Sequence, residues 1–346
     1  MNPAFFSNRH AVSVGLLLLG LLGLPVVLHC VGGVSLEQSY RGISERAGAY
    51  DYIRREIFEH REPVDVLFCG SSLLRNGIDV AIVKREMSRA LGRDVSVVLL
   101  PQSWQGPDSN YYVARDFLEN RPVKILVFGA PALIHHSSQP HVQLFRVVRY
   151  GDHPGALDGL GFRSRLATYA EFVLGAPRQA LNLLRTNPED PGASFKPATG
   201  SLLGYMGAPF VPRPVDPPAL DARSFLASDR SNPAFRFDAP DLNDYQFHYM
   251  EKTVELARRH GTFLVVLHMP SPSERGLGTV PWQRRSAQWL GPGVVLAGIP
   301  SASMFRSVPP DQYLDYFQDE HLNANGMALF TREFTPALIE LYERTR

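Results

Sequence analysis

The chain has 346 residues, of which 45% are hydrophobic and 20% are charged, and its formal net charge is +1. This composition is that of a globular protein with a sizeable core, and the length suits one large α/β domain with insertions. No basic block occurs, so the charge pattern gives no reason to expect nucleic-acid binding. The two cysteines, Cys30 and Cys69, lie in an apolar run and at the end of a predicted buried strand, and we expect no disulfide between them.

The N-terminal segment predicts a membrane anchor. Residues 11–31 contain no Asp, Glu, Lys or Arg, and at about 1.5 Å per residue they match a hydrocarbon core of roughly 30 Å. Pro25 within this run is tolerated more readily in a membrane helix than in a soluble one. Arg9 before the run favours a cytoplasmic tail at residues 1–10 and a catalytic domain outside the membrane, in the periplasm. A cleaved signal peptide and a buried soluble helix are the alternative interpretations.

The rest of the chain alternates between strand and helix patterns. Residues 35–62 have helical spacing and are interpreted as a stalk or first helix, followed by a domain over residues 63–346. The patterns predict strands at 64–69, 95–100, 124–128, 262–268 and 294–299, and helices at 79–91, 110–119, 243–260 and after Asn323. Such alternation indicates an α/β fold, a three-layer sheet of mainly parallel strands covered by helices on both faces.

Residues 130–240 interrupt this alternation. Helical spacing occurs around residues 166–184, and a long stretch rich in Pro and Gly follows. A structureless loop of this length is unusual in a compact domain, so we interpret the region as an insertion with some helix and some extended coil. Segments of this kind often carry specificity.

Two short segments carry the candidate chemistry. The first predicted strand ends at Gly70-Ser71-Ser72-Leu73, where a sharp turn presents a serine at the carboxyl edge of the sheet. Asp319-Glu320-His321-Leu322-Asn323 precedes the last predicted helix. A serine nucleophile needs a neutral imidazole to take its proton, and that imidazole needs an acceptor that fixes its tautomer. Either segment alone is common, whereas the two together predict a triad of Ser72, His321 and Asp319, with Glu320 as the alternative acceptor.

These residues resemble the SGNH (GDSL-like) hydrolase superfamily. Gly70-Ser71-Ser72-Leu73 lies where the first block of that family, Gly-Asp-Ser-Leu, belongs, and Asp319 and His321 lie where its last block belongs. The Gly-Ser-Ser form and the Asp-x-His spacing are similar to the membrane-anchored branch that modifies polysaccharides and cell-wall polymers. The resemblance implies an O-acyl transferase or esterase acting beside a membrane-bound O-acyltransferase.

The middle blocks of the family match less well. Gly106, after the second predicted strand, is the candidate for an oxyanion donor beside the backbone N–H of Ser72. After the third strand the family has Gly-x-Asn-Asp, whereas this chain has Gly129-Ala130-Pro131-Ala132. Losing one oxyanion donor typically costs about two to three powers of ten in rate. The missing Asn therefore argues against efficient hydrolysis more than it argues against the predicted fold.

Other polar and aromatic residues are weaker candidates. Trp104, next to the proposed oxyanion loop, and His268, at the end of a predicted strand, are weak candidates for substrate binding, and packing is the commoner role of each. His135, His136 and His141 lack carboxylate or thiolate partners at ligand spacing, so we predict no metal site and no cofactor.

The sequence therefore predicts a membrane-anchored serine enzyme that transfers or hydrolyses O-acyl groups, most simply acetyl, on an extracytoplasmic glycan. A plain carbohydrate or lipid esterase is the first alternative. The second is a catalytically degenerate scaffold that binds a glycan or a membrane-bound O-acyltransferase. The absence of the Asn after the third predicted strand favours the scaffold, and the presence of all three residues of the Ser-His-Asp set opposes it.

Overall fold

The structure is a computed structural model that describes residues 8–30, 35–41, 50–102, 106–131, 140, 144–185 and 222–345. It divides into two compact units, each of which is described by itself. The first comprises residues 1–43 and 142–189, and the second comprises residues 44–141 and 190–346.

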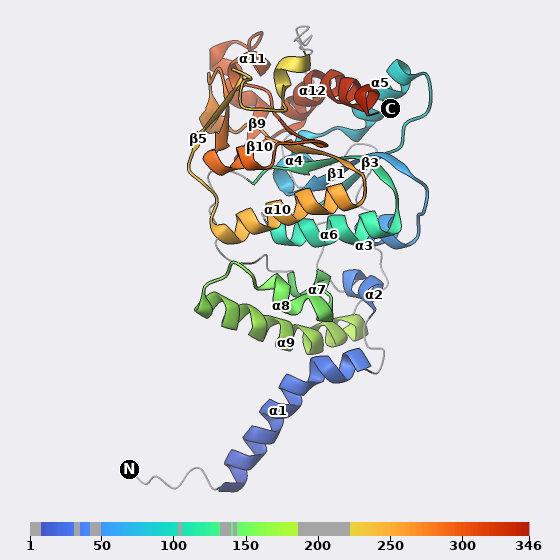
Figure 1. Cartoon of the computed structure of the whole chain (residues 1–346), viewed down its shortest axis with the longest axis vertical. Coiled ribbons are helices and arrows are strands. Elements are labelled where there is room, and N and C mark those ends of the chain that lie inside the picture. The colour runs from blue at the N-terminus through green and yellow to red at the C-terminus, as the bar shows by residue number, and fades with distance from the viewer. Residues whose placement is uncertain are drawn as a thin grey trace. The chain divides into compact units, whose positions relative to one another are not determined.

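The second unit is built on a six-stranded sheet (Figure 1). In spatial order its strands are β2 (Val97–Pro101), β1 (Val64–Gly70), β3 (Val123–Gly129), β6 (Phe263–Leu267), β8 (Val294–Ala297) and β4 (Leu226–Ala227). All neighbouring pairs are parallel except β4 with β8. The five parallel strands follow a common doubly wound order, in which the chain changes direction between β1 and β3. The predicted mainly parallel α/β sheet is thus confirmed.

Helices cover both faces of this sheet (Figure 1). The helices are α3 (Tyr50–Phe58), α6 (Pro107–Asn120) and α10 (Asp244–Arg259) on one face, and α5 (Val80–Leu91) and α12 (Ala324–Arg344) on the other. The short helix α4 (Ser72–Gly77) follows β1 directly and contacts α12. Strands buried on both faces need continuous apolar sequence, which β1 supplies over residues 66–70 and β3 over residues 125–129.

Local capping explains where the long helices begin. The Asp79 carboxylate accepts hydrogen bonds from the backbone N–H groups of Ala81 and Ile82, and Asn243 caps α10 through Gln246 N–H. A side-chain oxygen at this position satisfies amides that have no partner within the helix. The predicted helix starts at residues 79 and 243 are therefore confirmed to within a residue.

The predicted insertion at residues 130–240 is divided between the two units. Residues 142–189 belong to the first unit, whereas β4 and β5 (Phe235–Ala239) belong to the second. β4 forms the antiparallel edge of the main sheet, and β5 pairs in parallel with β7 (Val280–Gln283). Residues 190–221 lie outside the described part of the chain.

The first unit is helical. It contains α1 (Asn8–Cys30), α2 (Leu36–Arg41), α7 (Leu144–Val147), α8 (His153–Ala156) and α9 (Phe162–Arg185). The predicted anchor at residues 11–31 falls largely within α1. Within the described residues, no helix combines the length and apolarity needed to cross a membrane. The anchor therefore stays a prediction.

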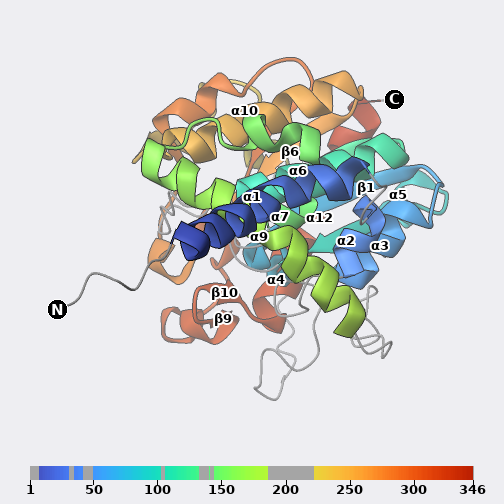
Figure 2. The same ribbon diagram turned by 90° about the horizontal axis from the view of Figure 1, so that it is seen from below.

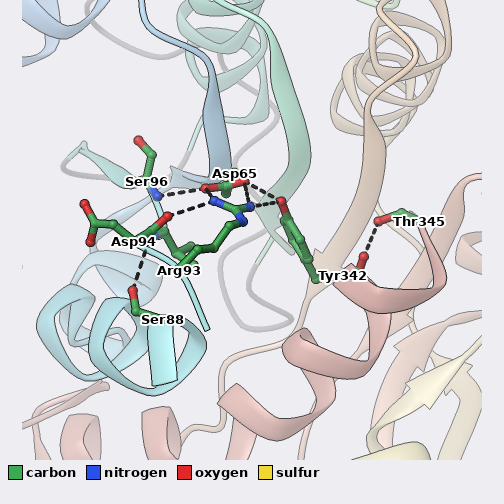
Figure 3. A network of polar contacts seen from close by, with 8 residues as sticks. Asp65, Ser88, Arg93, Asp94, Ser96, Tyr342 and Thr345 are labelled. Carbon is green, nitrogen blue, oxygen red and sulfur yellow. Dashed lines mark hydrogen bonds and ion pairs between the residues drawn. The ribbon is translucent and has the colours of Figure 1, made fainter. Parts of the chain in front are cut away.

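The amino-terminal edge of the sheet is held by a polar network around Asp65 (Figure 3). Its carboxylate accepts hydrogen bonds from the Arg93 guanidinium, from the Ser96 backbone N–H at 2.9 Å and from the Tyr342 hydroxyl. Burial alone would raise the pKa of Asp65, but these hydrogen bonds and the Arg93 charge hold it below its ordinary value. The network joins the start of β1 to the end of α12, at the edge opposite Ser72.

Candidate active site

Ser72 is presented by the turn between β1 and α4. Ser71 has an extended backbone, and Ser72 is the first residue of α4. The turn requires glycine at the preceding position, because a Cβ atom on Gly70 would lie 2.9 Å from Leu74 Cδ2 and 3.2 Å from the Gly129 Cα. The two glycines end neighbouring strands at the point where the sheet changes direction. Ser72 thus lies, half-buried, at the edge where such folds bind ligands.

His321 is positioned by a small antiparallel hairpin of β9 (Phe317–Gln318) and β10 (His321–Leu322). Asn323 fastens this hairpin to α12. Its side-chain oxygen accepts from the Asn325 and Gly326 N–H groups, and its Nδ2 donates to the Asp315 carbonyl at 2.7 Å. The Asn323 side chain therefore caps the helix and holds the loop before the hairpin at the same time.

Gly326 lets the loop pass close to the first turn of α12. A Cβ atom at this position would overlap the Tyr316 carbonyl oxygen and lie 2.8 Å from Leu322 Cδ2. The Asn323 backbone N–H donates to the same Tyr316 carbonyl at 3.0 Å. The Asn and Gly of the His321 segment therefore serve to place the histidine.

Ser72 and His321, 249 residues apart in sequence, meet in space. The Ser72 Oγ lies 2.8 Å from the His321 Nε2, within hydrogen-bond distance for a general base. For the hydroxyl to donate, Nε2 must be unprotonated and Nδ1 must carry the proton. Both side chains are half-buried. This arrangement allows His321 to take the proton from Ser72 as the oxygen attacks an electrophile.

Asp319, the predicted third member of the triad, lies in the turn between β9 and β10. It is exposed, and its backbone φ is 52°, in the left-handed region that Asp tolerates better than most residues. The neighbouring Glu320 is half-buried. The structure thus brings two of the three predicted triad members together.

The predicted oxyanion donors, Gly106 and Ser72 itself, lie at the beginnings of α6 and α4, the helices that follow β2 and β1. Gly106 is the residue that precedes α6, and it is buried. The first backbone bond of α4 runs from Arg75 N–H to the Ser71 carbonyl, so the N–H of Ser72 has no partner within the helix. Pro131 occupies the position at which SGNH hydrolases have an Asn, and a proline has no backbone N–H. The N–H of the preceding residue, Ala130, donates to the Leu267 carbonyl. Neither residue offers an amide to a substrate.

Of the two weak candidates for substrate binding, the structure describes His268 but not Trp104. His268 is buried, and its Nε2 lies 2.9 Å from the Glu274 Oε2, an arrangement typical of a packed histidine. Burial alone would raise the pKa of Glu274, but His268 holds it below its ordinary value. Trp104 lies outside the described residues, as do His135, His136 and His141.

The described residues contain no group of three His, Cys, Asp or Glu side chains that could hold a metal ion. The nearest thiol in sequence, Cys69, is buried at the end of β1. Its burial raises the pKa to about 12, although Gln102 lowers it slightly through a hydrogen bond. Cys69 is therefore poorly suited to be a nucleophile, because the thiolate is the reactive form.

Sequence reasoning missed several residues that shape this site. Gly77 ends α4, and a Cβ atom there would overlap the end of the Met269 side chain. Thr331 of α12 hydrogen-bonds the backbone on either side of residue 78. Gly77, two residues before the helix start predicted at Asp79, was a usable signal of a turn. A buried threonine more than 250 residues from its partners gives none.

Comparison with protein-family models, with characterised proteins and with solved structures gave no match for this chain.

Proposed function

We propose that the chain is a serine O-acyltransferase or esterase that acts on an extracytoplasmic glycan, with Ser72 as nucleophile and His321 as general base. The observation that carries this proposal is the 2.8 Å contact between Ser72 Oγ and His321 Nε2. The position of Ser72 at the carboxyl edge of the sheet supports it, and so does the resemblance of both segments to SGNH hydrolases.

The proposed reaction has two steps. Ser72 Oγ attacks the acyl carbonyl and its proton passes to His321 Nε2. His321 then returns this proton to the departing oxygen, which leaves an acyl ester on Ser72. In the second step a sugar hydroxyl, or water, gives its proton to His321 and attacks the acyl carbonyl. The bond to Ser72 Oγ then breaks and His321 returns the proton to that oxygen, which releases the acylated sugar or the free acid. The backbone N–H groups of Ser72 and Gly106 are the proposed oxyanion donors.

The membrane location belongs to the same proposal. We propose that residues 11–31 attach the chain to a membrane, with the catalytic unit outside the cytoplasm and a membrane-bound O-acyltransferase as partner. The apolar surface of α1 supports attachment, since Leu16, Leu17 and Leu19 are each more than 60% exposed. Fractionation followed by carbonate extraction tests this part. Recovery in the carbonate-soluble fraction would overturn it.

A scaffold without catalytic activity is the second candidate. The exposed position of Asp319 favours it, because the aspartate of a serine triad is typically buried beside its histidine. Such a protein would keep the fold and bind a glycan or the acyltransferase.

One experiment separates the two candidates. The full-length chain in detergent is incubated with an activated aryl acetate, and intact and peptide mass spectrometry locate the acetyl group. We expect acetyl on Ser72, and none there in Ser72→Ala or His321→Ala. Ser71→Ala is the matched control, because Ser71 is adjacent and its side chain makes no capping hydrogen bond. Folded protein that stays unlabelled at Ser72 would count against catalysis and favour the scaffold.

A further inference from the structure

The first unit carries an apolar stripe on α9 (Phe162–Arg185). Phe162 is 81% exposed, Leu166 is 61% exposed and Tyr169 is 45% exposed. Residues spaced by four and three positions lie on one face of an α-helix, so these three side chains form a continuous line. Isolated exposed apolar residues are ordinary, whereas a line of three large ones indicates a contact surface.

A different face of α9 packs within its own unit. Thr168 and Phe172 are buried on that face, and the Phe172 ring stacks on His153 of α8 with the ring centres 4.5 Å apart. Val173, four residues beyond Tyr169 and in line with the stripe, is buried as well, so the exposed part of the stripe ends at Tyr169. α7 and α2 also contact α9. The helix is therefore already fixed by its buried side chains, and Phe162, Leu166 and Tyr169 stay exposed beside that packing.

The charges beside the stripe are positive. Arg163 and Arg165 are both exposed, and the first acidic residue of the helix is Glu171. Glu171 is five residues beyond Leu166, which places it about 140° away around the helix axis. Aromatic and aliphatic side chains on one face with arginines at its border are the pattern of a helix that lies in a membrane interface.

α1 contacts α9 within the same unit through the end that is farther from the N-terminus (Figure 1), and the two helices cross in the view of Figure 2. α1 exposes its own apolar side chains, among them Leu16 and Leu17. The unit thus exposes apolar side chains on two helices that touch each other. A lipid surface is the partner that suits both at once, since a protein partner for α9 alone would leave the α1 leucines in water.

We propose that α9 is a second membrane contact, which lies in the headgroup region of an anionic bilayer with Phe162, Leu166 and Tyr169 inserted. This inference rests on the membrane attachment of α1 proposed above. It adds a specificity that an anchor alone lacks, because Arg163 and Arg165 favour anionic lipid headgroups. It also gives the helical unit a fixed orientation on the bilayer, which one flexible anchor does not provide.

The test uses the full-length chain reconstituted in vesicles that contain lipids brominated on the acyl chain, which quench nearby tryptophans. Leu166→Trp reports on the stripe, Glu171→Trp on the polar side of the same helix, and Leu17→Trp on α1. The emission of the three native tryptophans, of which Trp282 and Trp289 are buried in the other unit, is recorded in the wild-type protein in the same vesicles and subtracted. We expect the emission added by Leu166→Trp to be largely quenched and that added by Glu171→Trp to persist.

The three reporters distinguish the two membrane proposals. Quenching at position 17 without quenching at position 166 would overturn the α9 contact and leave the anchor standing, as expected if a protein covers the stripe. Absence of quenching at both positions would overturn both proposals. Raising the fraction of phosphatidylglycerol should strengthen quenching at position 166, and Arg163→Gln combined with Arg165→Gln should abolish that increase. Quenching that ignores lipid charge would overturn the anionic preference.

Discussion

The hydroxyl of Thr331 donates a hydrogen bond to the Gly77 carbonyl at 3.2 Å, and it accepts one from the Asp79 backbone N–H at 2.9 Å. Gly77 ends the helix that Ser72 begins, and Thr331 lies on the helix that follows His321 by three residues. Thr331 is fully buried. One side chain therefore joins the segment of the proposed nucleophile to the segment of the proposed base.

Thr331→Val tests this link with a side chain of nearly the same shape. The change leaves a buried carbonyl and a buried N–H without partners, which costs about 1–3 kcal/mol each. A shift of α4 by about 1 Å can lower a rate about 100-fold, so we expect acetylation of Ser72 to slow by at least about tenfold. Thr331→Ser should restore it. An unchanged labelling rate in folded Thr331→Val would show that Thr331 serves stability alone.

Gly326→Ala tests the placement of His321. The new methyl group would meet the Tyr316 carbonyl, a backbone atom that cannot move without displacing β9. We expect a loss of about 1–3 kcal/mol of stability, the usual cost of overpacking, together with a weaker reaction at Ser72. Gly278→Ala is the control, since its Cβ would meet no atom within 4 Å. Thermal unfolding and acetylation rates should change in the first variant and stay near the wild-type values in the second.

Asp319→Asn separates a role in catalysis from a role in the turn. Asn tolerates the left-handed backbone as well as Asp does, so this substitution removes the charge while sparing the turn. If Asp319 approaches His321 when substrate binds, we expect the rate of Ser72 acetylation in Asp319→Asn to fall on the order of 100-fold. This is the lower end of the rate effect that a positioned acid or base usually contributes. Glu320→Gln should cost less. A larger loss in Glu320→Gln would assign the orienting role to Glu320 instead.

The elements that local sequence determines were predicted well. The strand at residues 64–69 and the helix after Asp79 depend on apolar runs and on a capping side chain, and both agree with the structure. The Ser72 and His321 segments were also found from sequence, because each follows a strand or precedes a helix. Their 2.8 Å approach follows from the sheet order and the β9–β10 hairpin, which no local pattern encodes.

The features that sequence did not reveal depend on distant contacts. Residues 142–189 form a unit with the N-terminal helices, although about a hundred residues separate the two parts. β4 has only two residues and forms by pairing with β8, so neither its length nor its composition predicts a strand. Asp319 is exposed in a two-residue turn and has a left-handed backbone, which the Asp-x-His spacing alone does not predict. In each case tertiary structure decides what the local sequence leaves open.

Glu333 should make the stability of the protein depend on pH. It is 4% exposed on α12, and neither carboxylate oxygen has a hydrogen-bond partner among the described residues. Burial raises its pKa to about 8, and the charge of Arg306 offsets this only in part. The folded state therefore keeps the proton up to about pH 8, whereas the unfolded chain loses it near the ordinary value of 4.5.

The sign of the effect follows from this difference. Between about pH 4.5 and pH 8 the folded state binds more protons, so the free energy of unfolding falls as pH rises through that window. Glu333→Gln removes the titrating group, and we expect its unfolding temperature to exceed that of the wild type by a margin that grows from about pH 5 to about pH 8. Equal slopes for wild type and Glu333→Gln would mean that Glu333 is already ionised in the folded protein.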